Sequence, residues 1–168
     1  MLYKIAHILR DKLPWIWDVI GIINSFLFEL RYDGKMGQVQ NILTHFTKTT
    51  EEDGYALFYK IEALCKDNLS LLAKMFAEQP ASAFDFFKPH GFDELSLNKL
   101  AKDKSFLAYI VVVEGNAQQK VCVGYFFQRS FFWGKSFRGY MTDYRWQRRG
   151  INKMMNLCAR RKSTRLNS

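Results

Sequence analysis

A short basic loop at residues 145–150 offers the clearest chemistry in this chain. Arg148 and Arg149 precede Gly150, and a helix is predicted to begin after the glycine, because apolar residues recur from Ile151 at helical spacing. Backbone N–H groups at a helix start lack partners within the helix, and the helix dipole favours negative charge there. A glycine also lets an anion come close to the backbone. These residues therefore predict a phosphate-binding site.

The elements on either side must position this loop. Residues 137–144 are predicted to form a strand, since aromatic residues and threonine follow a Gly-Lys turn. The helix after the loop carries Ile151, Met154, Met155 and Cys158 at spacings of three and four, with polar residues opposite. A strand, a basic loop and a helix in this order present unpaired N–H groups at the helix start.

Two common phosphate motifs, G-x-G-x-x-G and G-x-x-x-x-G-K-[ST], are absent. Residues 147–152 instead resemble the Q/R-x-x-G-x-G/A signature of the GNAT superfamily of acyl-CoA-dependent N-acyltransferases, with Asn152 where that family usually has Gly or Ala. In the family, the loop holds the CoA pyrophosphate and the preceding strand runs beside the pantetheine arm. The resemblance implies acetyl-CoA as acyl donor. The expected contacts are Thr142, Tyr144, Gln147, Arg148, Arg149, Gly150, Ile151 and Asn152.

The order of the predicted elements matches the first part of the GNAT fold. One strand is followed by two short helices, three strands joined by short turns, and the helix after the loop. Their expected ranges are 55–64, 69–78, 93–102, 106–114, 120–129, 135–143 and 151–161. Short turns join antiparallel neighbours. We therefore expect an α+β fold: a GNAT-like mixed, mainly antiparallel sheet flanked by helices and preceded by an N-terminal helical appendage.

The expected domains are the helical appendage at 1–50 and the GNAT-like domain at 51–168, which holds only the N-terminal part of the family's fold. After the CoA-binding helix the family continues with further strands and a helix, whereas only residues 162–168 follow here. The strand before the loop would then have an open edge. We expect self-association through that edge, weak CoA binding and little turnover.

The appendage contains an apolar run at residues 13–30, which carries Asp18 and Glu29. Three interpretations stay open for this run: a helix packed on the domain, a helix lying on a membrane surface, and a membrane span. Glycines at 34 and 37 predict a turn before a second short helix at 36–46, and the polar residues 47–54 are predicted to be a linker.

The resemblance implies transfer of an acetyl or other acyl group from a CoA thioester to a primary amine of unknown identity. The amine must lose a proton, and the thioester oxygen needs a donor, commonly a backbone N–H near a bulge in the strand before the loop. Asp143 is the first candidate for the base and Glu62 the second. Tyr144 or Tyr140 is a candidate to place the thioester or protonate the thiolate.

Asp143 and His90 each also have a purely structural interpretation. Asp143 at a strand end can pair with Arg138 or Arg145 instead of acting as a base. His90, between a proline and a glycine, can face the acceptor or simply bond to the backbone of its own turn.

Length and composition indicate one folded domain: 168 residues, 48% hydrophobic and 16% aromatic. The net charge is +9, and from Arg145 onward there are eight Lys or Arg and no Asp or Glu. This end of the chain could attract nucleic acid, and residues 13–30 a membrane surface. Two alternatives are therefore a nucleic-acid binder and a membrane-surface or assembly protein, each with a vestigial CoA loop.

Three cysteines lie far apart and form neither a disulfide framework nor a metal motif with the three histidines. We therefore predict no metal site. A reducing compartment follows from the same observation. The expected location is cytoplasmic, with association to a membrane left open by residues 13–30.

Overall fold

The computed structural model describes residues 14–44, 47–52, 55–85, 87–114 and 120–166. These residues form an α+β fold. Its elements in chain order are α2 (Pro14–Thr44), β1 (Thr47–Glu52), β2 (Tyr55–Ala63), the 3₁₀ turn η1 (Lys66–Asn68), α3 (Leu69–Ala77), η2 (Ala81–Phe84), α4 (Glu94–Lys102), β3 (Phe106–Glu114), β4 (Lys120–Ser130), β5 (Ser136–Thr142), η3 (Tyr144–Trp146) and α5 (Ile151–Leu166).

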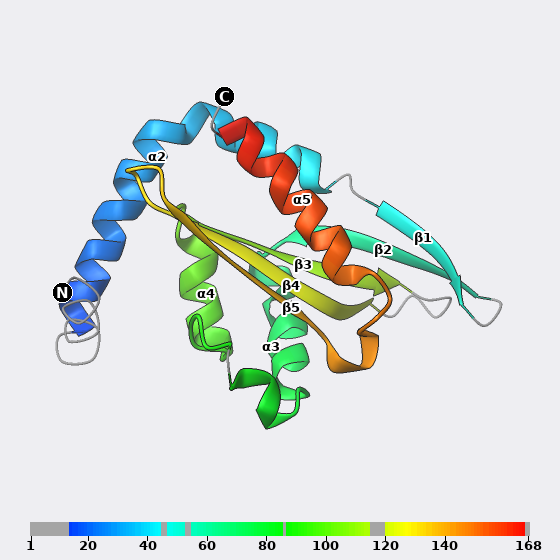
Figure 1. The fold of residues 1–168 in the computed structure, drawn as a ribbon. Helices are drawn as coiled ribbons and strands as arrows, with labels where there is room; N and C mark the ends of the chain where they lie inside the picture. Colours follow the sequence, from blue (N-terminus) through cyan, green and yellow to red (C-terminus); the bar gives the residue numbers. More distant parts are fainter. Residues whose placement is uncertain (1–13, 45–46, 53–54, 86, 115–119, 167–168) are drawn as a thin grey trace.

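The five strands form one antiparallel sheet in the order β1-β2-β3-β4-β5. Figure 1 shows α5 and the C-terminal half of α2 on one face, and α3 and α4 on the other. Both faces of β3 and β4 are therefore covered, which explains why these strands are buried along nearly their whole length. The predicted antiparallel arrangement of β3, β4 and β5 is confirmed.

The α5 face of the sheet brings that helix unusually close to β4. Ile151 and Met155 are buried, and they pack over Gly124. A Cβ at this glycine would lie 3.0 Å from Ile151 and 3.2 Å from Met155. The glycine thus lets the first turns of α5 sit directly on the sheet.

Helix α2 differs from the prediction. It is one helix of 31 residues and continues through Gly34 and Gly37, where we predicted a turn and a second helix. Glycine in a helix interior costs only about 1 kcal/mol relative to alanine. Packing of the second half of α2 beside α5 and β2 offsets that cost, and the helix bends rather than breaks (Figure 1).

The N-terminal half of α2 is packed on the rest of the fold through a narrow face. The Asn24 side chain donates to the Ser130 carbonyl at 3.0 Å and accepts from the Phe132 N–H at 3.1 Å, and Phe28 is buried. The structure thus supports the first of the three interpretations of this run. Among the described residues, no helix has both the length and the apolar character needed to cross a membrane.

The polar residues after α2 were predicted to be a linker, and this was wrong. Residues 47–52 form β1, which pairs antiparallel with β2. The sequence there is Thr-Lys-Thr-Thr-Glu-Glu, and threonine is β-branched and favours strands even though it is polar. The boundary expected between residues 50 and 51 therefore falls inside a strand.

Helix α5 also extends further than expected, to Leu166 instead of residue 161. The open edge predicted for the strand before the loop is present in the described part of the chain, where β5 is the last strand of the sheet.

Candidate functional site

The loop singled out from the sequence lies where β5 ends and α5 begins. The Asp143 carboxylate accepts the Arg145 N–H at 2.9 Å, which caps η3, and the Trp146 N–H donates to the Asp143 carbonyl at 2.9 Å. The chain therefore turns tightly after Thr142 before it reaches the helix.

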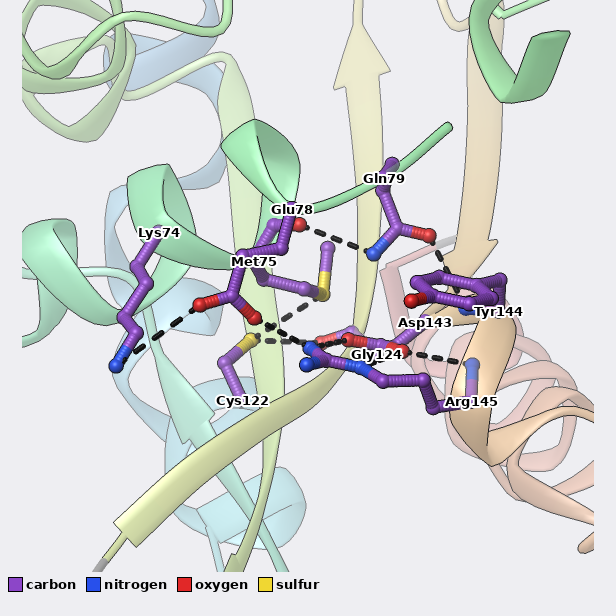
Figure 2. A network of polar contacts seen from close by, with 9 residues as sticks. All are labelled: Lys74, Met75, Glu78, Gln79, Cys122, Gly124, Asp143, Tyr144 and Arg145. Atoms are coloured by element: carbon purple, nitrogen blue, oxygen red, sulfur yellow. Dashed lines mark hydrogen bonds and ion pairs between the residues drawn. The ribbon is translucent and has the colours of Figure 1, made fainter. Parts of the chain in front are cut away.

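A polar network ties this turn to the end of α3 (Figure 2). The buried Asp143 carboxylate pairs with Arg145 at two points, Nε to Oδ1 at 3.0 Å and Nη2 to Oδ2 at 2.7 Å. The same Nη2 also donates to Glu78, and the Tyr144 N–H donates to Gln79 Oε1 at 3.0 Å. The loop is thereby held by side chains from two separate elements.

These contacts bear on the role of Asp143. Burial alone would raise the pKa of its carboxyl, but the hydrogen bonds and charge of Arg145 lower that pKa below its ordinary value. A general base works best when its pKa is near the operating pH. The geometry therefore favours the alternative stated for Asp143, an ion pair with Arg145 that holds the loop.

A cavity of about 530 Å³ opens on the α5 side of this turn. That volume lies in the range of about 300–1,000 Å³ typical of small-molecule sites. Six of the eight predicted contact residues line it, together with Tyr140 and Trp146: they are Thr142, Gln147, Arg148, Gly150, Ile151 and Asn152. Of the other two, Arg149 lines an adjacent crevice and Tyr144 lines neither space.

The start of α5 has the features expected of an anion site. Gly150 has φ 78° and Arg148 φ 67°, both in the left-handed region. The first helical bond runs from the Met154 N–H to the Gly150 carbonyl at 3.0 Å, so the N–H groups of residues 151–153 have no partner four residues earlier. The first turn carries no acidic residue. Its positive end is therefore not neutralised by a carboxylate of its own.

Arg149 does not point into the cavity as a simple counter-charge. Its guanidinium lies 4.6 Å from the centre of the Trp146 ring, and that ring packs edge-on against Tyr59 at 6.3 Å. Tyr59 comes from β2 and was missed as a site residue. Leu57, Tyr59 and Ile61 alternate in the sequence, which places their side chains on one face of a strand, but no sequence signal shows that this face meets the loop.

Glu62, the second candidate for the base, lies away from the cavity. It alternates with Ile61, which is buried in the core under α5, so Glu62 points to the opposite face. There it pairs with Lys120 at 3.0 Å and Lys60 at 3.4 Å. Burial alone would raise the pKa of Glu62, but these two lysines lower it.

His90 has the structural role given as its alternative, because it bonds to the backbone of its own turn. Its Nδ1 lies 2.7 Å from the Gly91 carbonyl and its Nε2 2.8 Å from the Tyr125 hydroxyl. Burial lowers the pKa of His90, and Tyr125 is itself fully buried. The neutral imidazole thus donates to the backbone and accepts from the tyrosine, which locks the segment before α4 onto β4.

The bulge expected in the strand before the loop is one strand away. The register between β3 and β4 shifts where Val111 faces Gly124 and Val112 faces Cys122, so Val123 is the extra residue. The pairing of β4 with β5 is regular, and the Asp143 N–H donates to the Val123 carbonyl at 3.0 Å. The bulge therefore supports the end of β5 from the side.

In the part of the chain that the structure describes, no group of three or more His, Cys, Asp or Glu side chains could hold a metal ion. Cys122 is buried beside Met75, and desolvation raises the pKa of its thiol to about 12. It is a core residue rather than a nucleophile.

Comparisons with protein-family models, with curated proteins and with solved structures find no match for this chain. Its function must therefore be inferred from its own geometry.

Proposed function

We propose that the chain is an acyl-CoA-dependent N-acyltransferase of the GNAT type, with acetyl-CoA as donor and a primary amine as acceptor. The observation that carries this proposal is the cavity of about 530 Å³ formed jointly by the end of β5, the basic loop and the first turn of α5. A ligand there meets hydroxyls, amides, one arginine and unpaired backbone N–H groups.

In this proposal the pyrophosphate lies at the start of α5. The N–H groups of residues 151–153 donate to it and Arg148 supplies charge. Gln147 and Asn152 add side-chain amide donors. The pantetheine arm then runs along β5 past Thr142 and Tyr140, the two side chains of that strand that line the cavity.

The reaction joins the amine nitrogen to the thioester carbonyl carbon and breaks the carbon–sulfur bond. The amine gives up a proton and the leaving thiolate takes one up. Because Asp143 and Glu62 are both held in ion pairs, we assign the amine proton to water rather than to a carboxylate. Tyr140 is our candidate to protonate the thiolate, since it lines the cavity and Tyr144 does not. The location we propose is cytoplasmic.

We further propose that the outer edge of β5 pairs with another chain. Bonds from the Phe131 N–H to Lys135 and from the Asp143 N–H to Val123 place odd-numbered residues of this segment in the ladder with β4. The backbone groups of Ser136, Arg138, Tyr140 and Thr142 then point outward. An unpaired row of this kind favours self-association, with a second copy as the partner.

A second candidate function is contact with a membrane surface through α2. Its outward face exposes large apolar side chains at spacings of three and four: Trp15, Val19, Ile22, Ile23, Phe26 and Leu30. Arg31 lies on the packed side of the helix rather than in this stripe, and its guanidinium donates to the Phe132 carbonyl at 2.8 Å. The nucleic-acid alternative is less well supported, because Trp146 already packs against Arg149 and Tyr59.

Calorimetric titration of the purified chain with CoA tests the main proposal. Arg148→Ala should weaken CoA binding about fivefold to tenfold at low salt and reduce its salt dependence, because one screened charge contact is lost. Lys99→Ala is the matched control, since Lys99 is an exposed cation on α4, on the opposite face of the sheet. If the wild-type chain releases no heat with CoA, or both variants bind equally, the proposal is wrong.

A further inference from the structure

The hydroxyl of Tyr59 has no hydrogen-bond partner although it is buried. The residue is 2% exposed, and its hydroxyl oxygen is one of four buried side-chain atoms in the described residues without a partner. The other three belong to Asn98, Gln128 and Arg129, and none of these lines a space at the start of α5. Buried tyrosines ordinarily place this hydroxyl on a partner.

Tyr59 lines the crevice that adjoins the large cavity. The crevice is bounded by Tyr59, Arg149, Gly150, Ile151 and Met154, and it is too narrow for a water molecule. Gly150 and Ile151 belong to both spaces. Tyr59, which carries the unpartnered hydroxyl, therefore borders the same helix start from the β2 side, while the cavity borders it from the β5 side.

Arg149 covers this crevice. Its guanidinium lies over the Trp146 ring, 4.6 Å from the ring centre, and the residue is exposed to solvent. If Arg149 leaves the ring, the crevice opens beside Gly150. The guanidinium and the hydroxyl would then be two donors on one side of the helix start.

We propose that Tyr59 is a ligand-binding residue whose hydroxyl donates to a phosphate oxygen of the anion held at the start of α5, once Arg149 has moved from Trp146 to that anion. This inference rests on the proposed CoA site and deepens it. The crevice lies away from β5, where the proposal places the pantetheine arm. Tyr59 and Arg149 therefore serve the nucleotide end of CoA, where the phosphates are.

The test is calorimetric titration of the full chain with CoA, comparing wild type and Tyr59→Phe. We expect the phenylalanine variant to bind about fivefold to tenfold more weakly, as for loss of one hydrogen bond to a charged group. Its unfolding midpoint should be at or above that of the wild type, because the substitution removes only an unpaired buried hydroxyl. Tyr109→Phe is the control, since Tyr109 is also buried under α5 but lines neither space.

The movement of Arg149 has its own measurement. Because Trp146 also lines the cavity, its fluorescence is compared with and without the cation: saturation with CoA should change the tryptophan fluorescence of the wild type more than that of Arg149→Gln, and most of the wild-type change should be absent in Trp146→Phe. If wild type and Tyr59→Phe bind CoA within twofold of each other, or if Trp146 gives no signal on binding, this inference is overturned while the CoA site stands. If the wild-type chain binds no CoA, the proposed function fails first and this inference with it.

Discussion

The Arg145 guanidinium donates two hydrogen bonds to the Asp143 carboxylate, from Nη2 to Oδ2 at 2.7 Å and from Nε to Oδ1 at 3.0 Å. Because the same guanidinium also reaches Glu78, this pair joins the end of β5 to the end of α3. The carboxylate is therefore part of the frame that positions the loop. Replacing Asp143 distinguishes a carboxylate that holds the loop from one that acts as the base.

Asp143→Asn should lower the free energy of unfolding by roughly 1.5–3 kcal/mol at pH 7, because charge-assisted hydrogen bonds of a buried carboxylate are lost. The lowered pKa of Asp143 means that its stabilising contribution is complete above the unfolded pKa of about 3.9 and is lost as pH falls through the folded value. The difference between variant and wild type should thus shrink below about pH 4. Urea denaturation across pH measures this.

The control is Asp85→Asn, an exposed carboxylate next to η2, which should change stability little. If Asp143→Asn is as stable as wild type but loses turnover, Asp143 is the base after all.

The sequence predicted this arrangement well where local patterns decide it. Apolar spacing after Gly150 located α5, and runs of strand-favouring residues between short turns located β3, β4 and β5. The residues of the cavity could be predicted because strand end, loop and helix start are contiguous in the chain. Residues that are neighbours in the sequence are therefore also neighbours in the site.

Prediction failed where a distant contact decides the outcome. Two glycines indicated a turn in α2, but packing on α5 and β2 keeps the helix continuous. The threonine-rich β1 was missed because its polar residues indicated a linker, although threonine favours strands. Tyr59 lies 87 residues before Trp146 in the chain, and only the folding of the whole sheet brings the two rings together.

The outward face of α2 tests the second candidate function. Ile22→Asp and Phe26→Asp should each reduce flotation of the chain with anionic vesicles about tenfold or more, since a buried apolar side chain is worth about 1.5–3 kcal/mol. Stability should change little, because these side chains are 69% and 61% exposed. Leu95→Asp on α4, equally exposed, is the control. Unchanged flotation of all three variants would exclude α2 as the contact.

The edge of β5 can be tested with proline. Arg138→Pro removes an outward N–H that no bond to β4 uses, so it should block strand addition and shift self-associated chain toward monomer in sedimentation. Phe137→Pro is the matched control, because it removes an inward N–H and should cost about 1 kcal/mol or more of stability. A wild-type chain that sediments as a monomer at high concentration would contradict the proposed edge pairing.

The measurement that tests the central claim most directly is CoA titration of Gly150→Val beside Gly134→Val. Both glycines have positive φ, 78° and 93°, so a valine strains either position, by about 1–3 kcal/mol. Gly134 lies in the β4–β5 turn, where a new Cβ meets nothing within 4 Å. We predict that Gly150→Val loses CoA binding more than tenfold while Gly134→Val, with a similar loss of stability, binds as wild type does. Equal CoA affinity of Gly150→Val and the wild type would contradict a CoA site at the start of α5.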